Sequence, residues 1–144
     1  MKNSQNQELT AITSHEYKMR TWYCDTDQMG IIHHSNYIRY FEAARCDFMR
    51  TLGLSYAEVE ARGIMMPILD VESHYIAPLY FDEDITIKIS LFEEPKVRIV
   101  FHYEIINSKG KVVNYGSTTL GFMHSTSRRP TRVPEWFLTM ITGR

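Results

Sequence analysis

The chain has 144 residues, of which 44% are hydrophobic and 23% charged, a composition typical of one folded domain. Its formal net charge of −1 provides no overall attraction to nucleic acid. No apolar run approaches the roughly 20 residues of a transmembrane helix, so stable membrane insertion is not expected either.

Residues 1–14 are polar and predict a flexible N-terminal tail, followed by one domain over 15–144. The tail lacks the apolar block of a signal peptide. Cys24 and Cys46 have no zinc-binding spacing, so reduced thiols and a cytoplasmic location are expected.

The first two predicted elements are a strand and a long helix. Apolar and charged residues alternate over 16–23, which is typical of a strand. Large apolar side chains then recur at spacings of three and four over 36–52 and predict an amphipathic helix. Ser35 or Asn36 is its expected N-cap, and Gly53 its expected end.

A shorter helix is expected over 55–62, and the pattern then changes to strands. Four antiparallel strands are predicted, over 66–76, 85–91, 97–106 and 111–123. One long helix forms a core with about five strands only if the sheet curves around it. The predicted fold is therefore α+β, a curved antiparallel sheet wrapped around one long central helix, which dimerisation extends.

The segment 23–37, YCDTDQMGIIHHSNY, carries the candidate chemistry. It places Asp25 and Asp27 before a glycine and directly ahead of the long helix. A helix start offers unpaired backbone N–H groups and partial positive charge, so it can stabilise an oxyanion while a carboxylate acts as base or nucleophile. We assign Asp27 the main catalytic role and Asp25 a local structural one. The structural alternative is that both form Asx turns or caps.

Three other residues are candidates for this site. The backbone N–H groups of His34 and Ser35 are expected among the free donors at the helix start, and the His34 side chain is expected in the site. Tyr23 can donate its hydroxyl, although an aromatic residue at a strand end usually packs. His33 is expected on the surface. Neither the six histidines nor the two cysteines have metal-ligand spacing, so no metal is expected.

The segment 127–134 is basic and contains two prolines. Guanidinium groups pair well with phosphate oxygens, so Arg128, Arg129 and Arg132 can hold a nucleotide-like anion. A solvated loop fits these residues equally well.

The residues from Tyr23 to Arg45 resemble the hotdog-fold thioesterases of the 4-hydroxybenzoyl-CoA thioesterase and YbgC-like acyl-CoA thioesterase type. Their pattern, Tyr-x-Asp-Thr-Asp-x-x-Gly-x-x-x-His-x-x-Tyr, leads into a Phe-Glu-x-x-Arg helix. The resemblance implies that Asp27 is the catalytic carboxylate and that Tyr23 and His34 line the site. It also implies that the backbone N–H of His34 polarises the thioester carbonyl.

The same resemblance implies an acyl-CoA substrate, with the basic segment around Arg129 near CoA and sites at the interface of a homodimer or homotetramer. The expected function is hydrolysis of an acyl-CoA thioester to free acid and CoA. No cofactor is expected, because CoA is part of the substrate. Two alternatives are an acyl carrier protein thioesterase and a non-catalytic acyl-CoA-binding module. The acyl preference, and whether Asp27 acts as nucleophile or general base, are left open.

Overall fold

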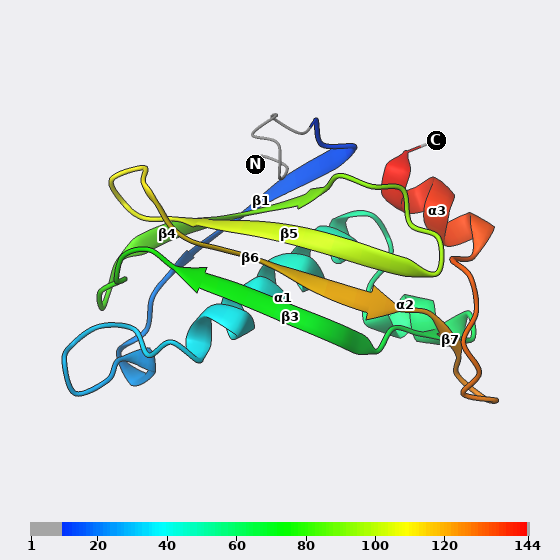
Figure 1. Ribbon diagram of the computed structural model, residues 1–144, viewed down its shortest axis with the longest axis horizontal. Coiled ribbons are helices and arrows are strands. Elements are labelled where there is room, and N and C mark those ends of the chain that lie inside the picture. The colour runs from blue at the N-terminus through cyan, green and yellow to red at the C-terminus, as the bar shows by residue number, and fades with distance from the viewer. Residues whose placement is uncertain (1–9, 144) are drawn as a thin grey trace.

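The computed structural model describes residues 10–143 and contains a five-stranded antiparallel sheet packed against one long helix (Figure 1). The strand order is β1-β4-β5-β6-β3, so β1 and β3 are the edge strands. The predicted α+β fold is confirmed. The strands span Thr13–Arg20 (β1), Asp84–Leu91 (β4), Arg98–Ile106 (β5), Val112–Gly121 (β6) and Ile68–Tyr75 (β3).

The long helix α1 (Asn36–Thr51) supplies the centre of the core. Because its apolar residues are spaced by three and four, Phe41, Ala44 and Phe48 all face the sheet and are buried. The Phe41 ring stacks on Tyr103 of β5, with a centroid separation of 4.4 Å. The observed helix matches the predicted range to within one residue at its C-terminal end.

One charged side chain lies inside this core and connects α1 to the short helix α2 (Tyr56–Ala61). Arg45 is 5% exposed, and its guanidinium donates to the phenol oxygens of Tyr56 at 2.6 Å and Tyr103 at 3.1 Å. The Tyr103 hydroxyl also lies 2.6 Å from the hydroxyl of Thr118 on β6. These bonds satisfy polar groups that would be costly to bury alone.

A glycine sets the distance between α1 and the sheet. A Cβ atom on Gly116 of β6 would collide with the backbone oxygen of Glu72 on β3, and would lie 2.8 Å from the Phe41 ring. The close approach of helix and sheet therefore requires a residue without a side chain at this position.

The edge strand β3 is almost entirely exposed. It pairs with β6 on one side, and α1 packs mainly under β1 and β4 at the other side of the sheet. Ile68, Leu69 and Tyr75 are 47%, 52% and 48% exposed. A long exposed edge strand is a surface that can pair with another chain.

The structure departs from the sequence predictions at the ends of the chain. β1 begins at Thr13, inside the range predicted as a tail, and residues 1–9 of that range lie outside the described residues. The first strand also ends at Arg20, because Tyr23–Asp25 forms a 3-10 turn.

The predicted strand 111–123 is interrupted. Its last part is β7 (Met123–His124), which pairs with β2 (Ile64–Met65) in a separate two-stranded sheet. The C-terminal helix α3 (Glu135–Thr142), which buries Phe137 and Ile141, was not expected from the sequence. Within residues 10–143, no helix has the length and apolar character needed to cross a membrane.

Candidate active site

The loop between β1 and α1 folds into a tight turn that begins at Asp27. The Asp27 N–H donates to the Ile31 carbonyl at 2.8 Å, and Thr26 forms a bridge with Ile32. Gly30 has a φ of 79°, a left-handed conformation that glycine adopts without strain. The Asp-x-x-Gly spacing thus fixes the backbone on both sides of the Asp27 side chain.

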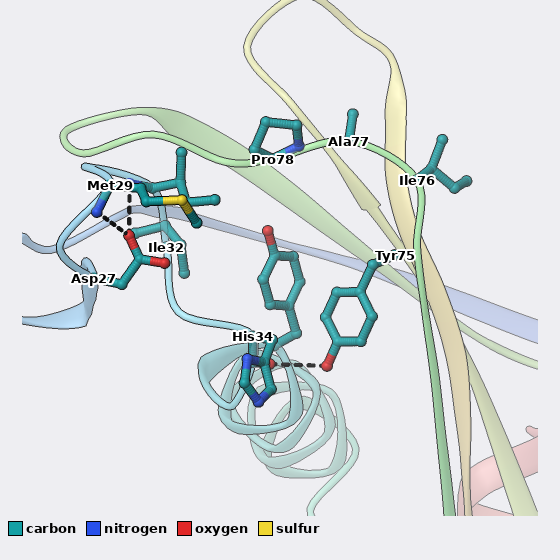
Figure 2. A pocket seen from close by; sticks show the side chains of 10 residues that line it. Asp27, Met29, Ile32, His34, Tyr75, Ile76, Ala77 and Pro78 are labelled. Atoms are coloured by element: carbon teal, nitrogen blue, oxygen red, sulfur yellow. Dashed lines mark hydrogen bonds between the residues drawn. The ribbon is translucent and has the colours of Figure 1, made fainter.

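The Asp27 carboxylate is half-buried and closes an Asx turn with one of its oxygens. Asp27 Oδ1 accepts from the backbone N–H of Met29 at 2.8 Å and of Ile31 at 3.4 Å (Figure 2). The Oδ2 atom has no hydrogen-bond donor among residues 10–143, and in Figure 2 it points away from the turn. Asp27 therefore does form an Asx turn, the structural alternative to a catalytic role, but its Oδ2 atom remains available for catalysis.

Asp27 and the start of α1 line the same cavity, which has a volume of about 410 Å³ and is named here the Asp27 cavity. Its walls come from the turn, the residues before α1, the first turn of α1, and the end of β3 with the segment that follows (Figure 2). The lining residues are Asp27, Met29, Ile31, Ile32, His34, Tyr37, Tyr75, Ile76, Ala77 and Pro78.

His34, which lines this cavity, has a free backbone donor at the start of α1. The His34 N–H has no acceptor among residues 10–143, whereas the Ser35 N–H already donates to His33 Nδ1 at 3.2 Å. Of the two predicted oxyanion donors, only that of His34 is therefore free. Ser35 does not cap the helix with its side chain, because its hydroxyl lies 2.9 Å from His33 Nδ1.

Two tyrosines hold the opposite wall in place. The Tyr75 phenol donates to the His34 carbonyl at 2.9 Å, which ties β3 to the start of α1. The Tyr37 ring lies edge-on to Tyr75 at 5.0 Å, and its hydroxyl accepts the Leu79 N–H at 3.3 Å. Burial raises the pKa of Tyr37, so this phenol stays neutral at physiological pH.

The sequence did not predict site roles for these tyrosines. Tyr37 lies on the apolar face of the predicted helix over 36–52, and Tyr75 lies in the predicted strand over 66–76. Two features of the sequence could have indicated these roles: Tyr37 is the last residue of the motif, and Tyr75 lies three residues before a proline.

Tyr23 lies away from the Asp27 cavity. It is 73% exposed in the 3-10 turn, and its ring lies edge-on to Phe81 at 5.3 Å. The strand that was expected to aim its hydroxyl at the site ends three residues earlier, at Arg20. The structure therefore does not bring this candidate beside Asp27 within one chain.

The predicted anion-binding arginines lie at the other end of the molecule. In Figure 1 the turn after β7 is at the right, whereas the loop before α1 is at the left. A helix of 16 residues, about 24 Å long at 1.5 Å per residue, separates them. Arg128, Arg129 and Arg132 consequently do not reach the Asp27 cavity of their own chain.

One of these arginines lines a second cavity, of about 600 Å³, named here the basic cavity. Arg132 shares its wall with Arg98 of β5, while Arg128 and Arg129 lie in the exposed turn beside it. Arg98 was not predicted, because it is the exposed member of an alternating strand pattern. The lining residues are Pro67, Leu69, Val97, Arg98, Gly121, Phe122, Met123, Pro130, Thr131 and Arg132.

Comparisons with known proteins identify the family of the chain. Residues 20–141 match the thioesterase-like superfamily. The chain is 22% identical over 123 residues to the acyl-CoA thioester hydrolase YbgC of Escherichia coli, covering 85% of this chain and 92% of YbgC.

Solved structures show the same similarity. The DHNA-CoA thioesterase of Staphylococcus aureus has a TM-score of 0.80 and 34% identity, covering 86% of this chain and 83% of that one. A hypothetical protein from Thermus thermophilus has a TM-score of 0.82 and 32% identity, covering 89% of this chain and 97% of that one.

Proposed function

The chain belongs to the thioesterase-like superfamily, and from this we propose that it hydrolyses an acyl-CoA thioester to a free acid and CoA. One observation carries the proposal. Asp27, whose carboxylate has one oxygen available, and His34, whose backbone N–H is free at a helix start, line the same cavity. These are the two groups that acyl transfer from a thioester requires.

The proposed reaction places the thioester carbonyl oxygen on the His34 N–H. As the carbonyl carbon is attacked, negative charge develops on that oxygen, and the N–H and the partial positive charge of the helix start stabilise it. Asp27 either takes a proton from the attacking water or attacks the carbon itself to form a mixed anhydride, which water then hydrolyses. In both routes the carbon–sulfur bond breaks, and CoA leaves as the thiolate.

An assay of released thiol tests this function against the two alternatives. The purified protein is given a panel of acyl-CoA substrates and the same acyl groups on acyl carrier protein. We expect turnover of at least one acyl-CoA, with no preference for the carrier protein. A strong preference for the carrier protein would make it an acyl carrier protein thioesterase, and tight binding without turnover a binding module.

We further propose that the chain forms a homodimer through β3 and that each site uses both chains. A two-fold axis pairs the β3 strands in opposite directions, which extends the sheet and covers the exposed edge. Leu69, at the N-terminal end of β3, and Pro67 just before the strand line the basic cavity, whereas Tyr75, at its C-terminal end, lines the Asp27 cavity. Antiparallel pairing therefore brings the basic cavity of one chain beside the Asp27 cavity of the other.

Val71→Lys tests this dimer. Val71 is 37% exposed on the face of β3 that is turned toward α1, so a lysine there places a charge in the proposed interface. We expect a folded monomer by light scattering, with activity lost because the site is incomplete. Glu72→Lys, on the opposite face of the strand, is the control and keeps the dimer. A parent protein that is monomeric and active would contradict the proposal.

The arginines of the basic cavity are proposed to bind the phosphates of CoA. Arg132→Gln and Arg98→Gln each remove one charged hydrogen-bond donor, a loss of about 1.5 kcal/mol, so we expect KM for an acyl-CoA to rise about tenfold. We expect kcat to stay within about twofold, because these groups lie away from the reacting carbon.

A truncated substrate and a control variant make this test specific. The same acyl group on N-acetylcysteamine lacks the phosphates, so its KM should not respond to either substitution. Lys18→Gln, on β1 at the sheet edge opposite β3, removes an exposed cation away from the proposed interface and should leave both KM values unchanged. An equal rise in KM for both substrates would rule out phosphate binding by the arginines.

A further inference from the structure

Asp25, the first carboxylate of the motif, is buried between the loop and α1. It is 6% exposed, so its carboxylate oxygens need hydrogen-bond donors from the protein. Asp25 Oδ2 accepts the Tyr40 phenol at 2.9 Å, and Oδ1 accepts Arg39 Nη1 at 3.1 Å. The Cys24 thiol lies 3.7 Å from the same Oδ1.

The backbone of Asp25 makes a second set of contacts to the same helix start. Its carbonyl oxygen accepts the His33 N–H at 2.8 Å and the Asn36 side-chain amide at 3.0 Å. Arg39 Nη1 also donates to Asn36 Oδ1 at 2.8 Å. We name Asp25, Asn36, Arg39 and Tyr40 the Asp25 clamp; three members lie in the first two turns of α1, and the fourth lies two residues before Asp27.

The clamp connects the two groups that the proposed reaction must hold in register. Asp27 lies two residues after Asp25 in the loop, and His34, whose backbone N–H is free, lies two residues before Asn36 at the start of the helix. Beyond its own turn, the tip of the loop is joined to the rest of the protein by a bridge from Ile31 to Tyr80. A displacement of about 1 Å between reacting groups can cost about 100-fold in rate.

We propose that Asp25 is a positioning residue, which acts through Asn36, Arg39 and Tyr40 to fix the Asp27 carboxylate relative to the His34 N–H. This inference rests on the proposed thioester hydrolysis. It gives Asp25 a role beyond local structure, because the separation of the two reacting groups then depends on the clamp.

The bond from Tyr40 is the most informative one to remove. The Arg39 side chain is 68% exposed, so its ion pair with Asp25 is screened by water and contributes little. The Tyr40 phenol is buried, and burial together with its hydrogen bond to Asp25 raises its pKa, so it remains a donor at physiological pH. Tyr40→Phe removes this donor and leaves the packed ring in place.

For Tyr40→Phe we expect kcat for acyl-CoA to fall about 10- to 100-fold, with KM changed by less than about threefold. Asp25→Asn should behave in the same way. Tyr56→Phe is the matched control, because it removes a half-buried phenol that accepts from Arg45 Nε at 2.6 Å, remote from the loop. We expect the parent kcat for Tyr56→Phe in protein that is equally folded by circular dichroism.

A double-mutant cycle separates positioning from a general loss of structure. In an Asp27→Asn background, Tyr40→Phe should lower the residual kcat by less than about twofold, because no carboxylate remains to be positioned. A parent kcat for Tyr40→Phe, an equal loss in Tyr56→Phe, or a full further loss in the double mutant would each overturn the inference. Full activity of Asp27→Asn alone would instead overturn the proposed role of Asp27.

Discussion

Asp27→Asn is expected to lower kcat for acyl-CoA hydrolysis by about 100-fold or more while the fold stays intact. The asparagine oxygen can still accept the Met29 N–H, which is 2.8 Å from Asp27 Oδ1, so the turn is retained. The substitution removes the negative charge and with it the base or nucleophile. Steady-state kinetics on released thiol, together with circular dichroism and thermal unfolding, measure both parts of the expectation.

His34→Ala provides the internal comparison for that result. The proposed oxyanion donor is the backbone N–H, which alanine keeps, so we expect a smaller loss of kcat than for Asp27→Asn. Damage equal to or greater than that of Asp27→Asn would show that the imidazole takes part in the chemistry. An Asp27→Asn protein that turns over acyl-CoA at the parent rate would remove Asp27 from the mechanism.

Gly116→Ala is expected to lower the free energy of unfolding by about 3 kcal/mol, the upper end of the cost of overpacking a core. The new Cβ would collide with the Glu72 carbonyl oxygen and lie 2.8 Å from the Phe41 ring. The backbone of β3 and the packed α1 would both have to move, and neither can do so without losing core contacts. Urea denaturation followed by circular dichroism measures the change.

Gly121→Ala is the matched control in the same strand. Its Cβ would meet the tip of the Leu69 side chain at 3.2 Å, and this exposed side chain can rotate away. We expect the free energy of unfolding to change by less than about 1 kcal/mol, helped by the lower entropy of the unfolded chain. Equal losses for the two substitutions would show that the clash at Gly116 does not determine the helix-to-sheet distance.

The fold was predictable where the local pattern was long and regular. The spacing of three and four from Tyr37 to Leu52 located α1 to within one residue, because one face of that helix is fully buried. The alternation that located β1 continued past Arg20, where a 3-10 turn ends the strand. The alternation of apolar and charged residues does not indicate such a turn. Tyr23 was therefore predicted to lie at the end of the strand.

The sequence predicted only the part of the candidate site whose residues are close together in the chain. Asp27 and His34 are seven residues apart, and a glycine turn followed by a helix start brings them to one cavity. The wall formed by Tyr75 comes from β3 and depends on strand order, which one sequence does not specify. The basic cavity likewise joins Arg98 to Arg132 through tertiary packing, and its distance from Asp27 follows from the length of α1.

A crystal structure of the Asp27→Asn protein with an uncleaved acyl-CoA tests the central claim most directly. The account predicts that the thioester carbonyl oxygen accepts the His34 N–H at about 2.9 Å, with the carbonyl carbon facing the side chain at position 27. A thioester bound outside the Asp27 cavity, or a carbonyl oxygen held by other donors, would contradict it.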